Sequence, residues 1–184
     1  MRKIKKGVAA LLLGAAGFFG MHHAPGFVGD ALKDASAHRA VVPETAMIDL
    51  TEKLGRYARG REAEFLLVGN GPVGLLEATE DNSEENVARL VGALDAFFME
   101  SIFYDGYEED RKESEKNDAD TADYLAAMLR KPLLAGKQVF TLDYVKGEKI
   151  AEVEALGDAA GYISEGGDRL LDVIPERAPR GENA

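Results

Sequence analysis

Four short apolar runs recur along the middle and C-terminal parts of the chain. They occupy residues 65–68, 96–99, 139–142 and 160–163, and a polar or glycine-rich segment closes each of them. Apolar and polar residues do not alternate within the runs, which is typical of parallel strands covered on both faces. The pattern therefore predicts four buried strands.

Helical periodicity fills the segments between these runs. The predicted helices cover residues 43–59, a segment from about 81–85 to 94, residues 120–129, and residues 148–160. The second begins with Asp81-Asn82-Ser83 followed by acidic residues, as expected near the positive end of a helix dipole. The third is predicted to end near Lys131-Pro132. Because strands and helices alternate, the predicted fold class is α/β with right-handed crossovers.

Polar side chains follow the apolar runs. Asn70, Glu100 and Asp143 come directly or within two residues after the first three runs, and Ser164-Glu165 follows the fourth. In parallel α/β folds the functional site lies at the C-terminal ends of the strands. The alternative is that strands simply end where polar sequence begins, but four such ends favour a carboxylate-based site.

The first 37 residues are typical of an export signal. A basic start at residues 2–6 precedes an uncharged, largely apolar stretch at 7–21, and Ala35-Ser36-Ala37 forms a small-residue cleavage pattern. We therefore expect a signal peptide at 1–37, a linker at 38–45, and a secreted or cell-envelope protein. The alternative is an uncleaved N-terminal anchor, which would be the protein's link to a membrane.

Charge and composition exclude several classes of function. The net charge is −11, and residues 38–184 hold 17 basic and 31 acidic residues, so general binding to nucleic-acid phosphate is not expected. The chain has no Cys, and its three His residues lie at or before position 38. A Ser-His-Asp triad, a Cys-His pair and a His-ligated catalytic zinc site are excluded beyond that position. Any acid–base groups there are Asp, Glu, Tyr or Lys.

Four groups of motifs, in order along the chain, resemble those of the glycoside hydrolase family 114 barrel. They are 56–59 with 65–71 (RYAR, FLLVGNG), 94–104 (LDAFFMESIFY), 136–145 (GKQVFTLDYV), and 161–163 with 168–172 (GYI, DRLLD). The match covers about residues 46–175 and corresponds to strands five to eight of that barrel. The resemblance implies a parallel (βα)4 half of a TIM (β/α)8 barrel at 46–175. We expect a flexible tail at 176–184.

The same resemblance implies an activity. Family members are extracellular or envelope-associated, and those of known activity are endo-α-1,4-polygalactosaminidases that cut galactosamine-rich exopolysaccharide. We therefore expect an exported enzyme that hydrolyses glycosidic bonds in an amino-sugar polysaccharide, without a cofactor. No calcium-loop spacing is present, and no metal site is predicted.

Two carboxylates are the predicted catalytic pair. Glu100 matches the Glu of the family motif, which implies an acid/base role, and Asp143 is the most plausible second carboxylate within the chain. This interpretation requires both to emerge side by side from the same rim of the sheet. The alternative for Asp143 is a loop anchor that accepts backbone N–H bonds.

Other polar and aromatic residues near the strand ends are predicted to contact the sugar. They are Asn70, Tyr104, Asp105, Tyr107, Tyr144 and Glu165. An ordinary turn is the alternative for Asn70, and packing is the alternative for the tyrosines. The charged segment 105–120 is interpreted mainly as a solvated loop and helix face.

A non-catalytic protein is the alternative to the hydrolase. Four parallel strands cannot close a barrel, and they leave two edge strands and an apolar interior. A half-barrel of this kind is expected to bind sugar as a remnant, or to form a homodimer or pair with a second half-barrel. The family's other proposed catalytic carboxylate, an Asp, belongs to the half that has no counterpart here. A truncated gene product is the third interpretation.

Overall fold

The computed structural model describes residues 13–14, 42–105 and 114–168. The predicted signal peptide (apart from residues 13–14), most of the predicted linker, the predicted tail and Tyr107 lie outside these residues. Within the described ranges, no helix combines the length and the apolar character needed to cross a membrane. The chain divides into two compact units, residues 1–95 and 96–184.

The first unit holds two helices that pack through apolar side chains. Its elements are β1 (Leu13–Gly14), α1 (Pro43–Arg59), β2 (Val68–Asn70), the short 3-10 helix η2 (Pro72–Leu76) and α2 (Glu84–Ala93). Ile48 of α1 and Leu90 of α2 are buried. Beside them, Arg89 of α2 donates hydrogen bonds of 3.1 and 2.9 Å to the two carboxylate oxygens of Glu52 on α1. β1 and β2 pair in parallel.

Two capping arrangements set the ends of elements in this unit. The Ser83 hydroxyl accepts a hydrogen bond from the backbone N–H of Asn86, which caps α2. Asn82 is buried, and its amide nitrogen donates to the carbonyl oxygens of Leu75 and Glu77 at 3.0 and 2.8 Å. These bonds fix the turn that leads from η2 into α2.

The second unit is a parallel sheet with an additional hairpin. Its elements are β3 (Ala96–Glu100), β4 (Tyr104–Asp105), β5 (Glu115–Lys116), α3 (Ala119–Leu134), β6 (Gln138–Tyr144), α4 (Glu148–Ala160) and β7 (Ile163–Gly167). β6 lies between β3 and β7 and pairs in parallel with both. β4 and β5 form an antiparallel pair.

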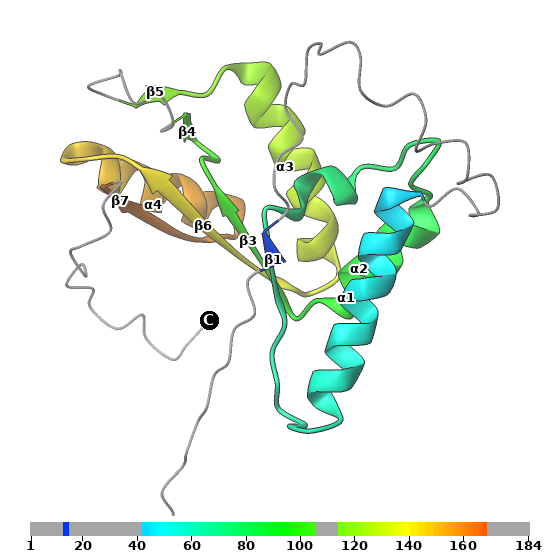
Figure 1. Ribbon diagram of the computed structural model, residues 1–184. Coiled ribbons are helices and arrows are strands. Elements are labelled where there is room, and N and C mark those ends of the chain that lie inside the picture. Colours follow the sequence, from blue (N-terminus) through cyan, green and yellow to red (C-terminus); the bar gives the residue numbers. More distant parts are fainter. Residues whose placement is uncertain (1–12, 15–41, 106–113, 169–184) are drawn as a thin grey trace, which may run out of the picture. The chain divides into compact units, whose positions relative to one another are not determined.

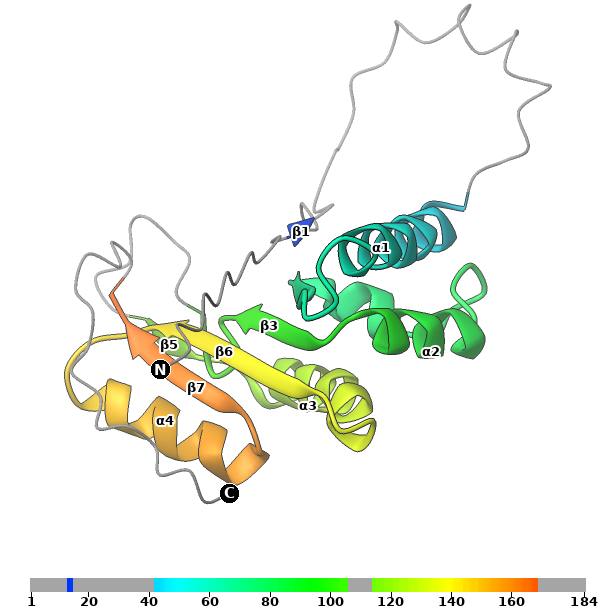
Figure 2. The ribbon, with the colours of Figure 1, turned by 90° about the horizontal axis from the view of Figure 1, so that it is seen from below.

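Helices α3 and α4 cover the same face of this sheet (Figures 1 and 2). The strand order β3-β6-β7 advances in one direction, and crossovers that keep the usual right hand then place both helices on one side. We call this side the helix face; its residues are Phe97, Met99, Val139, Thr141, Asp143, Ser164 and Gly166. We call the other side the opposite face; its residues are Phe98, Glu100, Phe140, Leu142, Tyr144, Ile163 and Glu165. The burial pattern agrees, because the helix-face residues are buried and those of the opposite face are half-buried.

The predicted α/β class is confirmed, and several element boundaries differ from the expectation. Gly161 adopts a left-handed φ of 80° and ends α4 at Ala160, so β7 begins at Ile163 instead of 160. Residues 164–167, expected to close the fourth run, form most of that strand. β2 is likewise shifted to 68–70, and α3 continues through Pro132. The β4–β5 hairpin was not predicted.

Candidate functional site

Glu100 lies at the C-terminal end of β3 on the opposite face, where it is half-buried. Its Oε2 atom accepts a hydrogen bond of 2.9 Å from the Tyr144 hydroxyl. Tyr144 is the last residue of β6, and Glu100 pairs with Leu142, two residues before it. Both side chains therefore project from the same face at the C-terminal ends of neighbouring strands, which is where parallel α/β folds carry their functional sites.

Glu165 lies in the same cross-strand row as Glu100. Leu142 pairs with Glu100 on one side and with Glu165 on the other, so the three residues share one face. Adjacent strands lie about 4.8 Å apart, which separates the backbones at the two glutamates by roughly 10 Å. The opposite face thus carries two carboxylates and the Tyr144 hydroxyl near the strand ends.

Asp143 does not belong to this group. It precedes Tyr144 in β6, so its side chain projects to the helix face, and it is fully buried. Its Oδ1 atom accepts hydrogen bonds from the backbone N–H groups of Phe103 and Tyr104 at 2.7 and 2.8 Å. The expectation that Glu100 and Asp143 emerge side by side is wrong, and the loop-anchor alternative describes the observed contacts.

The environment of Asp143 opposes its ionisation. Burial raises the pKa of its carboxyl, and the backbone hydrogen bonds from residues 102–104 lower it by a smaller amount. Within the described residues, its Oδ2 atom has no hydrogen-bond partner. Asp143 therefore anchors the segment after β3 on the helix face. Its carboxyl group does not point to the opposite face, where Glu100 lies.

The backbone turns sharply just after Glu100. Ser101 has a φ of 57°, a left-handed conformation that costs a non-glycine residue about 1–2 kcal/mol. Its N–H donates to the Leu142 carbonyl at 2.9 Å, and its own carbonyl accepts a hydrogen bond of 3.0 Å from the Asn117 side chain. After this turn the chain runs toward the helix face, where the backbone N–H groups of Phe103 and Tyr104 donate hydrogen bonds to Asp143.

Tyr104, which was predicted to contact a sugar, is part of the packing on the helix side. The residue is only 5% exposed and packs with Val145 and Val153. Its hydroxyl donates to Glu152 at 2.7 Å, and Lys116 donates to the same carboxylate at 2.8 Å. Burial, followed by the hydrogen bond to Glu152, raises the pKa of Tyr104 to about 12.

The remaining predicted sugar contacts stay predictions. Asp105 is exposed in the β4–β5 hairpin, opposite Glu115, and Tyr107 lies outside the described residues. Asn70 ends β2 in the first unit and precedes Gly71, which adopts a left-handed φ of 64°. Tyr144 shares the opposite face with Glu100, and its hydroxyl donates a hydrogen bond to that residue, a contact that was not predicted.

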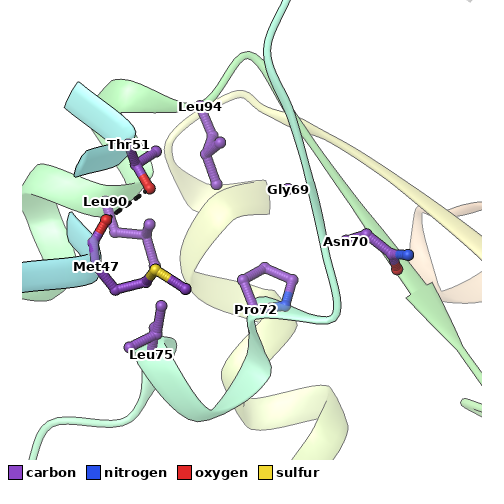
Figure 3. A pocket seen from close by; sticks show the side chains of 8 residues that line it. All are labelled: Met47, Thr51, Gly69, Asn70, Pro72, Leu75, Leu90 and Leu94. Carbon is purple, nitrogen blue, oxygen red and sulfur yellow. Dashed lines mark hydrogen bonds between the residues drawn. The ribbon is translucent and has the colours of Figure 1, made fainter. Parts of the chain in front are cut away.

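A small cavity in the first unit does not have the character of a ligand site. It has a volume of about 20 Å³, about the space of one water, and is lined mainly by apolar residues. Figure 3 shows the side chains of Met47, Leu75, Leu90 and Leu94 around it, whereas the Asn70 amide points away from it. We interpret it as a packing gap between β2 and the helices.

In the part of the chain that the structure describes, no group of three or more His, Cys, Asp or Glu side chains is arranged so that it could hold a metal ion. The polar groups that Glu100, Glu165 and Tyr144 place on the opposite face are two carboxyl groups and a phenol. Such groups can donate and accept protons at the ends of parallel strands.

Comparison with known proteins identifies a similar fold. The chain is similar to the glycoside hydrolase domain of PelA from Pseudomonas aeruginosa, with a TM-score of 0.52 and 20% identity over 79% of this chain. A structure of a single-residue variant of that domain gives a TM-score of 0.50 and 17% identity over 73% of this chain. In both cases the match spans 53% of the solved chain, or about half its length.

The other comparisons found no relative. No protein-family model matches the chain, and no curated protein matches it. The structural similarity shows that 79% of this chain shares the α/β fold of about half of a glycoside hydrolase domain.

Proposed function

We propose that this protein is a glycoside hydrolase with the (βα)4 half of a TIM-barrel fold, and that Glu100 is its catalytic acid/base. The observation that carries the proposal is the position of Glu100. It ends a parallel strand on the face opposite the helices, held by the Tyr144 hydroxyl at 2.9 Å. In TIM barrels that face is the barrel interior, and the strand ends at its C-terminal rim hold the active site.

Glu100 would donate a proton to the oxygen of the leaving sugar. Protonation lets the glycosidic C–O bond break without expelling a poorly stabilised alkoxide. General acid catalysis of this kind contributes about 10²–10⁴-fold to a rate. Because the Tyr144 hydroxyl donates to Oε2, we assign the transferred proton to Oε1.

The substrate class that we propose is an amino-sugar polysaccharide rich in galactosamine. The support is the resemblance of segments 94–104 and 136–145 to family 114, together with the acidic character of residues 38–184. A protein surface of this sign attracts a cationic, partly deacetylated polymer. We also propose export, on the pattern of residues 1–37.

The test is release of reducing ends from a galactosamine-rich polymer by the purified protein. Glu100→Gln keeps the size of the side chain and removes the transferable proton, so we expect the rate to fall at least about 100-fold. Asp123→Asn is the matched control, since it makes the same chemical change on the exposed surface of α3, a helix that covers the other face. An inactive wild type, or equal activity in Glu100→Gln, would reject the proposal.

A second candidate function is a non-catalytic half-barrel that binds carbohydrate after joining a second half-barrel, such as another copy. The opposite face favours it, because Phe98, Phe140, Leu142 and Ile163 are half-buried there beside the glutamates. A complete TIM barrel fills this region with side chains from all eight strands. A dimer in sedimentation that binds the polymer without cutting it would favour this candidate over the first.

A further inference from the structure

Glu165 and Glu100 share the opposite face. We propose that Glu165 is the second carboxylate of the reaction, that it activates the attacking water, and that hydrolysis consequently inverts the anomeric configuration. The inference rests on the proposed function and adds a residue role and a stereochemical outcome to it.

The neighbours of Glu165 fix the direction of its side chain. The Ser164 hydroxyl is fully buried and lies 2.6 Å from Thr141 Oγ1, and Ser164 packs so closely on α4 that a Cβ at Gly157 would collide with it. A Cβ at Gly166 would lie 2.9 Å from Ile150 Cα, also on α4. Both neighbours therefore face the helices, and strand alternation directs Glu165 to the opposite face.

The spacing between the two glutamates suits one of the two known arrangements. They lie two strands apart in one cross-strand row, which separates their backbones by about 10 Å. Retaining glycosidases hold their carboxyl groups about 5 Å apart, whereas inverting enzymes hold them about 6.5–9.5 Å apart to admit a water. Two glutamate side chains of equal length that leave one face side by side keep roughly the separation of their backbones, and a sheet that curves toward that face shortens it. The row therefore favours the wider spacing.

The roles follow from the proton balance of a single displacement. Glu165, as carboxylate, accepts a proton from a water whose oxygen forms a bond to the anomeric carbon. The bond from that carbon to the leaving oxygen breaks, and the proton of Glu100 passes to this oxygen. The reaction leaves Glu165 protonated and Glu100 ionised, and exchange with solvent restores both.

Proton NMR during digestion of an α-linked galactosamine oligosaccharide tests the inference. We expect the wild type to release the β-anomer first, before mutarotation. Release of the α-anomer first would overturn the inference and leave the hydrolase proposal standing. This measurement needs no variant and does not depend on whether a substituted protein folds.

Variants test the residue assignment. Glu165→Gln should lower the rate at least about 100-fold, with a thermal midpoint close to that of the wild type. Azide should partly restore turnover in Glu165→Gln, because this anion attacks without a general base, and the product should be the β-glycosyl azide. Azide should not restore Glu100→Gln on the same substrate.

The outcomes separate this inference from the proposed function. Near wild-type activity in Glu165→Gln, with Glu100→Gln inactive, would overturn the role of Glu165 alone. If Glu165→Gln fails to fold, Glu165→Asp replaces it, and a folded Glu165→Asp with an unchanged rate and anomer would likewise overturn the role. A wild type with no glycosidase activity would overturn both proposals.

Discussion

The Tyr144 hydroxyl on β6 donates a hydrogen bond of 2.9 Å to Glu100 Oε2 at the end of β3. The two residues lie on neighbouring strands, so the bond joins the ends of the strands across the opposite face. It restrains the Glu100 side chain, which a strand end alone would leave free to change rotamer. Preorganisation of this kind is what an acid/base group needs to meet a substrate oxygen.

Removing this hydroxyl should weaken catalysis more than folding. Tyr144→Phe keeps the ring and deletes the donor to Glu100. A hydrogen bond to a charged group contributes about 1.5–3 kcal/mol, so we expect kcat to fall roughly 10- to 100-fold. The pH–rate profile should also shift, which a purely structural role would not cause. Tyr57→Phe, on an exposed residue of α1, is the control and should change neither.

Asp143 should prove structural. Asp143→Ala leaves the buried N–H groups of Phe103 and Tyr104 without their acceptor, and we expect a loss of about 2–5 kcal/mol in the free energy of unfolding. Asp143→Asn retains an acceptor oxygen and should keep most of the hydrolytic activity. A folded Asp143→Asn protein that has lost its activity would contradict the anchor role and restore Asp143 as a catalytic candidate.

The raised pKa of Asp143 predicts how its contribution to stability depends on pH. The folded protein holds this proton more tightly than the unfolded chain, so stability from this group is present below pH 3.8 and is lost as the pH rises through the raised pKa. Asp143→Asn lacks this titration. Denaturant unfolding from pH 4 to 7 should therefore show the variant becoming more stable relative to the wild type as the pH increases.

Tyr104 should ionise unusually late. Its folded pKa of about 12 exceeds the ordinary value of 10.0, so its contribution to stability is present below about pH 10 and is lost as the pH rises toward 12. Absorbance at 295 nm should show a titration step near pH 12 that is missing in Tyr104→Phe. A difference between the two proteins centred near pH 10 would show that Tyr104 is exposed.

The contact between α4 and β7 predicts that replacing two helical glycines by alanine has opposite effects on stability. A methyl group at Gly157 would collide with Ser164, whereas one at Gly92 of α2 would meet no atom within 4 Å. We expect Gly157→Ala to cost about 1–3 kcal/mol or more by overpacking. Gly92→Ala should be neutral or stabilising by up to about 1 kcal/mol, because alanine favours helix. Equal thermal midpoints for the two variants would contradict the described packing.

The helices and the order of elements could be predicted from the sequence because their signals are local. The helix at 43–59 has an apolar stripe and a proline at its start, and the structure places α1 at these same residues. The helix at 148–160 was also predicted with the observed bounds. In contrast, the fourth strand was predicted to begin at residue 160, whereas β7 begins at Ile163. Gly161 ends α4 in a left-handed conformation, and the presence of a glycine in the sequence does not by itself show that conformation.

The face on which each carboxylate lies could not be predicted from the sequence. Polar and apolar residues do not alternate in the strand before Asp143, at residues 139–142 (VFTL). The sequence therefore does not indicate which side of the strand the helices cover. A shift of one residue exchanges the two faces. The predicted Glu100–Asp143 pair failed for this reason. Glu100 and Glu165 share the opposite face, and Glu165 is the second carboxylate that we propose instead of Asp143.

The most direct measurement compares Glu100→Gln with the wild type on two substrates. One is the galactosamine-rich polymer, whose leaving group needs a proton, and the other is a nitrophenyl glycoside of a galactosamine oligosaccharide, whose leaving group does not. If Glu100 is the acid, the variant loses at least about 100-fold on the polymer and far less on the nitrophenyl substrate. Equal losses on both substrates, or an unchanged rate on the polymer, would contradict the role of Glu100.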